Sequence, residues 1–127
     1  MTQSTTEATV KVGDVFVESW GYEQTNIDFY EVVEVTPSGK SVRLREIAAK
    51  AVEIGETTFL VPAVGNYLEP NGWDRVGKKA ADGSFLKRLT TGYRGQPYLR
   101  MSSYSGASLW DGERAYYDTL AAGHPGH

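Results

Sequence analysis

The feature that most constrains the fold of this chain is an alternation of side-chain character with a period of two, clearest in NIDFYEVVEV. Such alternation is typical of a β-strand, because successive side chains point to opposite faces of a sheet. Glu31 is the exception to the pattern. One face carries Ile27, Phe29, Val33 and Val35, and the other carries Asp28, Tyr30, Val32 and Glu34.

Segments on both sides of this strand extend the pattern to residues 10–47. A β-branched run before it is interrupted by Gly13-Asp14, where we expect a bend or bulge. After it, TPSGK offers a proline that presets a turn and a Gly39 that can take the left-handed position closing a hairpin loop. SVRLREI then alternates again, with Val42 and Leu44 toward the core and Arg43 and Arg45 outward. Together these segments predict a three-stranded antiparallel meander.

The rest of the chain reads as shorter strands and turns. AAKAVEIGE is either a continuation of the third strand or a single turn, and it ends at Gly55. TTFLVPAV predicts a short strand that Pro62 ends or confines to an edge, since proline cannot donate to a ladder. Residues 65–84 hold many turn residues and predict a long irregular connection. FLKRLTT and YLRMSSY predict a second hairpin, followed by strands around 107–110 and 114–117.

These patterns indicate a mainly β fold, and 127 residues suit a single domain. We expect a small SH3-like barrel or an open antiparallel β-roll over residues 10–120, between flexible tails at 1–9 and 121–127. No apolar run approaches the roughly 20 residues of a membrane span. The N-terminal residues lack the order of a signal peptide, and the absence of cysteine excludes disulfides. A cytosolic location fits these observations.

The formal net charge of −3 hides a strong asymmetry along the chain. Residues 1–74 carry a net charge of −7, residues 75–100 a net charge of +6, and the remainder a net charge of −2. The basic block contains seven cations against Asp82. Such a block either steers an anionic partner or forms a solvated face that pairs with the acidic half in space.

The connection between the first two strands, Ser19 to Asn26, is rich in specific side chains. It is about eight residues long, more than the two to five of common hairpins. Aromatic rings with polar tips, beside amides and a hydroxyl, are typical of recognition sites. The alternative is a loop that packs on itself and covers the end of the barrel. The candidate binding residues here are Trp20, Tyr22, Gln24, Thr25, Asn26 and Tyr30.

The second hairpin interleaves cations with aromatic rings. On alternating positions, Tyr98, Arg100, Ser102 and Tyr104 share one face. Cations beside stacking rings suit single-stranded nucleic acid or a nucleotide. Because the chain is acidic overall, a small phosphorylated ligand fits better than a long duplex, and an ordinary exposed strand face is the alternative. Arginines bind phosphate bidentately, and the candidates are Arg43, Arg45, Arg88, Arg94 and Arg100. Trp110, within SLWDGE, is either a stacking platform or core packing.

WGYEQTNIDFYEVVEV followed by GKSVRLREI resembles a group of small, mostly uncharacterised proteins of phages and other mobile elements. These proteins carry a WGY-x-QTN-x-DFY-x-V block, then a Gly-Lys turn and a basic strand. YLRMSSYSGASLWDG is similar to their C-terminal half. The resemblance covers residues 15–47 and, more loosely, 85–113. It implies a phage or plasmid accessory protein in a bacterial cytoplasm that binds and neutralises something of the host, as in counter-defence, and it brings no established activity.

The sequence gives little support for catalysis. Its only histidines, His124 and His127, lie near the end of the chain, and a fixed metal site or a catalytic triad needs a rigid frame. Carboxylate pairs such as Asp28 with Glu31 occur on any acidic strand. We therefore expect a non-enzymatic protein without cofactors that sequesters a nucleotide-like ligand or a host factor. The alternatives are an inhibitor of a host enzyme, acting through an edge strand or an acidic face, and a protein that contacts nucleic acid. A homo-oligomer would supply the deep pocket that a small barrel lacks.

Overall fold

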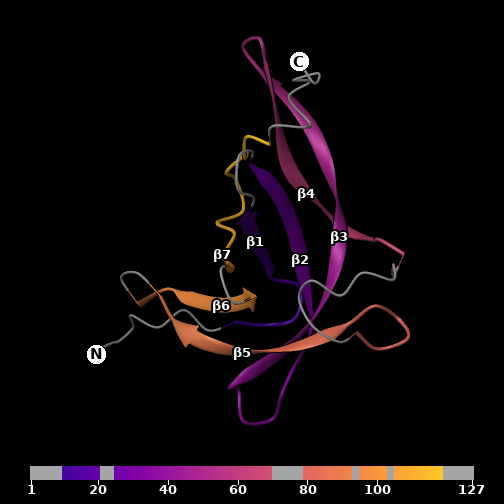
Figure 1. Cartoon of the computed structure of the whole chain (residues 1–127), viewed down its shortest axis with the longest axis vertical. Coiled ribbons are helices and arrows are strands. Elements are labelled where there is room, and N and C mark those ends of the chain that lie inside the picture. Colours follow the sequence, from indigo (N-terminus) through magenta and orange to yellow (C-terminus); the bar gives the residue numbers. More distant parts are fainter. Residues whose placement is uncertain (1–9, 21–24, 70–78, 93–94, 103–104, 119–127) are drawn as a thin grey trace.

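The computed structural model describes residues 10–20, 25–69, 79–92, 95–102 and 105–118 (Figure 1). Both expected tails, 1–9 and 121–127, lie wholly outside these residues. All seven elements named in the described residues are β-strands, and no helix there is long and apolar enough to cross a membrane. The strands are β1 (Val15–Trp20), β2 (Asn26–Val35), β3 (Ser41–Ile54), β4 (Thr57–Tyr67), β5 (Phe85–Thr91), β6 (Pro97–Ser102) and β7 (Ser105–Leu109).

The strands form a small barrel in which every pairing is antiparallel. The sheet order is β2-β1-β7-β6-β5-β3-β4, and an additional pairing of β2 with β3 closes a ring of hydrogen bonds. β4 pairs with the far half of β3 and lies outside this ring. The structure therefore confirms the mainly β class and, of the two architectures expected, the barrel. The meander β1–β2–β3 and the hairpin β5–β6 are also confirmed.

Two apolar clusters explain why β2 is buried on both faces. The first lies inside the ring, because all six ring strands contribute to it. Its members are Val10, Phe16, Tyr30, Val32, Val42, Leu44, Phe85, Leu99, Met101 and Ala107. The second cluster lies on the outer face of β1, β2 and β3, where β4 and the segment after β7 cover it. Its members are Val15, Val17, Ile27, Phe29, Ile47 and Leu60, with Trp110 and Tyr116 packed against them.

A bulge in β2 corrects the expected placement of Val35. The register of β2 against β3 shifts between Val32 and Glu34, so Val33 is an extra residue without an opposite partner. The extra residue reverses the alternation, and Val35 packs against the cluster inside the ring rather than with Phe29. The prediction that Val35 shares a face with Phe29 is therefore wrong.

The connection between β1 and β2 is shorter than the expected Ser19–Asn26. Trp20 of β1 lies opposite Asn26 of β2 as the last pair of the ladder, so both belong to strands. The connecting residues are 21–25, and 21–24 lie outside the described residues. At the other end of β1, residues before Val15 do not extend the strand. Gly13 has a φ of 98°, and the Asp14 carboxylate accepts a hydrogen bond from the Lys11 N–H at 2.9 Å, which fixes a turn there.

β3 and β4 run further than the sequence indicates. The strand alternative for AAKAVEI is confirmed, since β3 continues to Ile54 and turns at Gly55, whose φ is 66°. β4 is an edge strand, as expected from Pro62, but it continues past this proline to Tyr67. The expected strand around 114–117 is wrong: within the described residues only an isolated bridge between Leu60 and Tyr116 forms there.

Candidate functional site

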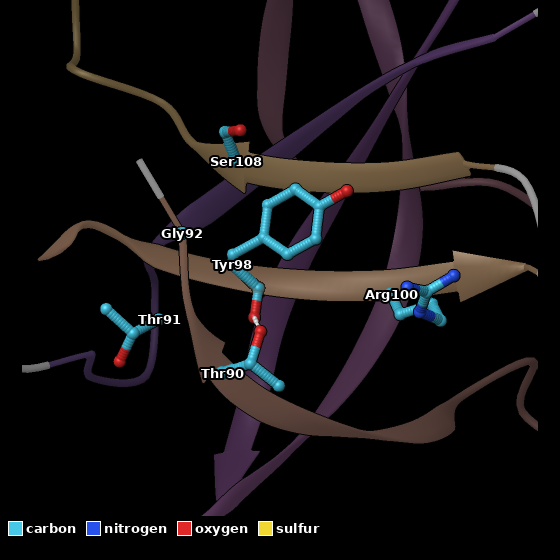
Figure 2. Close-up of a pocket in the computed structure, with 6 residues that line it drawn as sticks. All are labelled: Thr90, Thr91, Gly92, Tyr98, Arg100 and Ser108. Carbon is cyan, nitrogen blue, oxygen red and sulfur yellow. Dashed lines mark hydrogen bonds between the residues drawn. The ribbon is translucent and has the colours of Figure 1, made fainter. Parts of the chain in front are cut away.

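A hollow of about 530 Å³ lies on the outer face of β5, β6 and β7, away from both apolar clusters (Figure 2). Strand register places three side chains in a row across it, because Thr90 lies opposite Tyr98 and Tyr98 lies opposite Ser108. Among the described residues the lining is polar and aromatic and contains no carboxylate, imidazole or thiol. The lining residues are Thr90, Thr91, Gly92, Tyr98, Arg100 and Ser108.

The Tyr98 ring is the central feature of this hollow, and two glycines give it room. A Cβ atom built on Gly106 would overlap the hydroxyl and ring carbons of Tyr98, so the ring lies directly over the Gly106 backbone. A Cβ atom built on Gly92 would come within 3.0 Å of the Tyr98 Cβ. The Thr90 hydroxyl donates a hydrogen bond to the Tyr98 carbonyl at 3.1 Å, which ties β5 to β6 at this position. Contacts within the protein therefore fix the position of the Tyr98 ring before a ligand binds, and the ring is called seated in this sense.

Replacing Gly106 by alanine is expected to lower the free energy of unfolding by about 1–3 kcal/mol, the usual cost of forcing an extra methyl group into a packed site. The added methyl must displace the Tyr98 ring, because the ring occupies the space in question. Urea denaturation measures the change. The matched control is the same substitution in a Tyr98→Ala background, where the cost is expected to fall below 1 kcal/mol. An equal cost in both backgrounds would contradict the packing of the Tyr98 ring on Gly106.

Two arginines of the second hairpin lie on the same outer face. Leu89 of β5 lies opposite Leu99 of β6. In an antiparallel pair the residue before Leu89 lies opposite the residue after Leu99, so Arg88 lies opposite Arg100 across the two strands. Like charges placed directly opposite destabilise a sheet, and an anion between them removes that cost. The guanidinium of Arg88 makes no ion pair or hydrogen bond with the residues that the structure describes.

The candidate residues at the end of β1 and the start of β2 do not line this hollow. The indole N–H of Trp20 donates a hydrogen bond to Asp28 at 2.6 Å, so its polar tip is already engaged. Thr25 and Asn26 are half-buried beside it. The other two candidates of this group, Tyr22 and Gln24, lie outside the described residues.

Tyr30 lies inside the barrel, where its side chain is only 2% exposed. Its hydroxyl donates a hydrogen bond to the Glu18 carboxylate at 3.1 Å, and Ser105 donates to the other carboxylate oxygen at 2.5 Å. Ser102 extends this chain through a 2.7 Å hydrogen bond between the two serine hydroxyls. Glu18 is fully buried, and no pattern in the sequence singled it out. This polar cluster lies within the core, away from the outer hollow.

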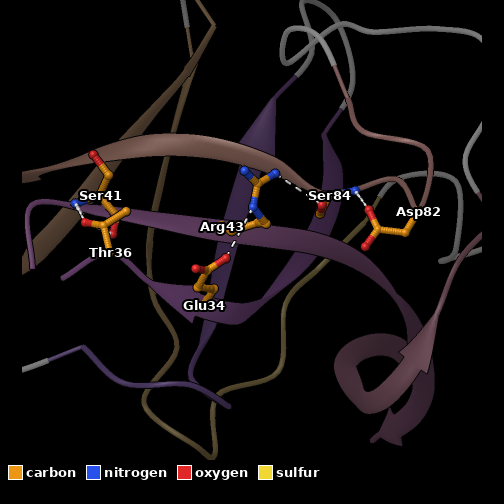
Figure 3. Close-up of polar contacts among 6 residues, drawn as sticks. All are labelled: Glu34, Thr36, Ser41, Arg43, Asp82 and Ser84. Carbon is orange, nitrogen blue, oxygen red and sulfur yellow. Dashed lines mark hydrogen bonds and ion pairs between the residues drawn. The ribbon is translucent and has the colours of Figure 1, made fainter.

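Arg43 faces outward as expected but is held by neighbouring side chains (Figure 3). Its guanidinium lies 3.5 Å from the Glu34 carboxylate and donates a hydrogen bond to the buried Ser84 hydroxyl at 3.3 Å. Ser84 also hydrogen-bonds Asp82 through its hydroxyl and its N–H, and these bonds hold the pKa of the Asp82 carboxyl below its usual value. Arg43 therefore links β3 to the segment before β5.

Arg45 stacks on an aromatic ring instead of facing open solvent. Its guanidinium carbon lies 4.2 Å from the centre of the Tyr67 ring. The Tyr67 hydroxyl donates a hydrogen bond to Glu31 at 3.2 Å, and the Gly65 N–H donates to the same carboxylate at 2.9 Å. Desolvation, followed by the Glu31 charge, raises the pKa of Tyr67. This arrangement fixes the end of β4 to the barrel.

Trp110 lies beside the second apolar cluster, in line with the packing alternative. Its indole N–H donates a hydrogen bond to the Arg114 carbonyl at 2.8 Å, and its ring packs against the second cluster together with Tyr116. Of the arginines expected to bind phosphate, the structure brings Arg88 and Arg100 together and leaves Arg43 and Arg45 elsewhere. Arg94 lies outside the described residues.

Sequence reasoning identified the face of Tyr98 and Arg100 but missed the other residues that line the hollow. Thr90 and Thr91 belong to β5, Gly92 follows its end, and Ser108 belongs to β7, so the register of three strands was needed to find them. Within the described residues, no group of three histidine, aspartate or glutamate side chains could hold a metal ion. Comparison of the chain with models of protein families, with curated proteins and with solved structures found no match.

Proposed function

We propose that this chain is a non-enzymatic binding protein that holds a small, nucleotide-like phosphorylated ligand in the hollow on β5, β6 and β7. The observation that carries the proposal is the seated ring of Tyr98 beside Arg100 in a hollow rimmed by hydroxyl groups. A volume of about 530 Å³ falls within the usual range of small-molecule sites.

Each lining group supports one part of such a ligand. An aromatic ring offers a flat surface on which a base stacks, a contact worth about 1–3 kcal/mol in nucleic-acid complexes. The Arg100 guanidinium binds phosphate oxygens in a fork geometry, and Arg88 adds a second positive charge across the strands. The hydroxyls of Thr91 and Ser108 both donate and accept hydrogen bonds, which suits a sugar or phosphate. The Thr90 hydroxyl already donates to the Tyr98 carbonyl and can accept a hydrogen bond from a sugar hydroxyl.

We propose binding without turnover because of the chemistry of the residues that line the hollow. General acid–base catalysis most often uses histidines, carboxylates or amines, and a serine or threonine hydroxyl acts as a nucleophile when such a base lies beside it. The described lining residues supply hydroxyls, an aromatic ring and a guanidinium instead. In the biological setting implied by the resemblance to proteins of mobile elements, the protein would sequester its ligand in the cytoplasm of a bacterial host and so blunt a defence response.

Calorimetric titration with adenosine monophosphate, adenosine and inorganic phosphate tests this function. We expect the monophosphate to bind more tightly than either fragment, because only it engages both Tyr98 and the arginines, and we expect chromatography to recover it unchanged. Tyr98→Ala should weaken binding of the monophosphate and of adenosine alike. Wild-type affinity in both Tyr98→Ala and Arg100→Ala would overturn the site, and conversion of the monophosphate into a product would overturn the non-enzymatic role.

A further inference from the structure

The far half of β3 and the paired half of β4 form a two-stranded arm with one open edge (Figure 1). The pairing of β2 with β3 ends at Phe29 and Ile47. Beyond that point, β3 pairs only with β4, from Ala49 opposite Pro62 to Ile54 opposite Thr57. The other edge of β3 over 49–54 therefore has no neighbouring strand among the described residues.

The hydrogen bonds of β4 show which backbone groups face this open edge. Leu60 exchanges two hydrogen bonds of 2.8 Å with Tyr116, so its N–H and C=O point away from β3. In an antiparallel ladder, residues directly opposite each other either both face the partner strand or both face away. Ala51 lies opposite Leu60, so its N–H and C=O point to the open edge. Ala49 and Glu53, two residues away on either side, point the same way.

The two edges of the arm differ in how they are protected. On the outer edge of β4, Tyr116 pairs with Leu60, and Pro62 offers no N–H donor. The open edge of β3 carries neither a proline nor a bulge over 49–54, and β3 is regular there. Exposed edges with free backbone groups are templates for the addition of another strand.

We propose that the open edge of β3 pairs antiparallel with the same edge of a second copy of this chain, around a two-fold axis at Ala51. The product is a dimer with a continuous sheet of β4 and β3 from one copy followed by β3 and β4 from the other. Ala51 then pairs with its own equivalent, and Ala49 of each copy pairs with Glu53 of the other. In this register all three edge residues of both copies exchange hydrogen bonds.

The charges of the segment favour a second copy and this register. Lys50 and Glu53 cancel, so two copies carry no net repulsion across the edge. An axis at Ala51 places Lys50 opposite Val52 of the other copy, where its aliphatic stem covers an apolar side chain. An axis at Lys50 would place two lysines directly opposite each other, which is destabilising. An axis at Val52 would lose one of the three hydrogen-bonded pairs.

Pairing also stabilises an arm that is otherwise thin. Its face opposite Leu60 is apolar, with Val52, Phe59 and Val61 half-buried and Ile54 56% exposed. A lone two-stranded ribbon is marginally stable in water, whereas additional strands make a sheet more stable. The dimer supplies two more strands and aligns the two apolar faces.

Cysteine substitution gives the sharpest test, because the chain contains no cysteine of its own. In the proposed register two Ala51 Cα atoms lie about 5.5 Å apart, which suits a disulfide, so Ala51→Cys is expected to form a covalent dimer under mild oxidation. Ala49→Cys is the matched control. Its two copies would be about 14 Å apart along the strands, too far to bridge. Equal cross-linking of the two variants, or none in either, would overturn the register.

The mass in solution provides a second measurement on the unmodified chain. We expect the wild-type protein to have the mass of a dimer in light scattering and native mass spectrometry. Ala51→Pro removes the edge N–H without touching the ladder to β4, and it should give a monomer, while Ala51→Ser keeps the N–H and should remain a dimer. A monomeric wild-type protein would overturn the proposal and leave the edge to a strand of another protein. Neither variant alters the ligand hollow, so this test is independent of the proposed function.

Discussion

Replacing Arg100 by alanine is expected to weaken the binding of adenosine monophosphate by about 10- to 150-fold. Hydrogen bonds to a charged group contribute about 1.5–3 kcal/mol, and the substitution removes such bonds to the phosphate. It also removes one of the two positive charges that face each other across β5 and β6. Calorimetry at low ionic strength measures the effect most clearly, because salt screens exposed charges.

Two comparisons separate this effect from a general loss of charge. Arg114→Ala removes one positive charge from a residue that contacts Tyr116, outside the hollow, and is expected to leave affinity nearly unchanged. Adenosine lacks the phosphate, so its affinity should change little in Arg100→Ala. An equal loss for adenosine and its monophosphate would show that Arg100 does not bind the phosphate.

Replacing the buried Glu18 by alanine is expected to lower the free energy of unfolding by about 3 kcal/mol. The substitution leaves a cavity inside the ring and removes the acceptor that Tyr30 and Ser105 share. Glu18→Gln keeps the shape and one carbonyl acceptor, and it should cost about 1 kcal/mol. Urea denaturation of both variants gives the two values.

The exposed Glu34 provides the control for this experiment. Glu34→Ala breaks only a surface ion pair with Arg43, so its expected effect is within about 0.5 kcal/mol. If Glu18→Ala costs no more than Glu34→Ala, the chain of hydrogen bonds from Tyr30 to Ser102 does not contribute to stability. If Glu18→Gln costs as much as Glu18→Ala, the charge rather than the shape of the side chain is what the core requires.

The alternation of side chains along each strand predicted most of the fold. The structure differs from these predictions where pairing between distant strands sets the register. Val42 and Leu44 are buried as expected, because β3 is regular over the barrel. The bulge at Val33 could not be read from the sequence, since two consecutive valines, Val32 and Val33, fit either register and only the partner strand selects one. β4 continues past Pro62 for a similar reason: the proline nitrogen faces the outer edge, where no ladder bond is lost.

The candidate site could be predicted only in part, because the sequence shows neighbours along a strand and not across strands. Tyr98 and Arg100 are two residues apart, so their common face followed directly from the period of two. Ser108 joins them only because β7 lies between β1 and β6, an order that local patterns do not reveal. Trp20 and Tyr30 were predicted to bind a ligand because their rings and polar tips suit recognition. In the structure the Trp20 N–H donates a hydrogen bond to Asp28, and the Tyr30 hydroxyl donates one to Glu18.

Nuclear magnetic resonance mapping of bound adenosine monophosphate tests most directly whether the hollow on β5, β6 and β7 is the binding site. In a titration of isotope-labelled protein, the largest shifts are expected at the amides of Thr90, Thr91, Gly92, Tyr98 and Ser108. These shifts should saturate, and at the same ligand concentration they should be markedly smaller in Arg100→Ala because its affinity is lower. The largest shifts at Trp20 and Asn26, or no saturable shifts anywhere, would contradict the proposed site.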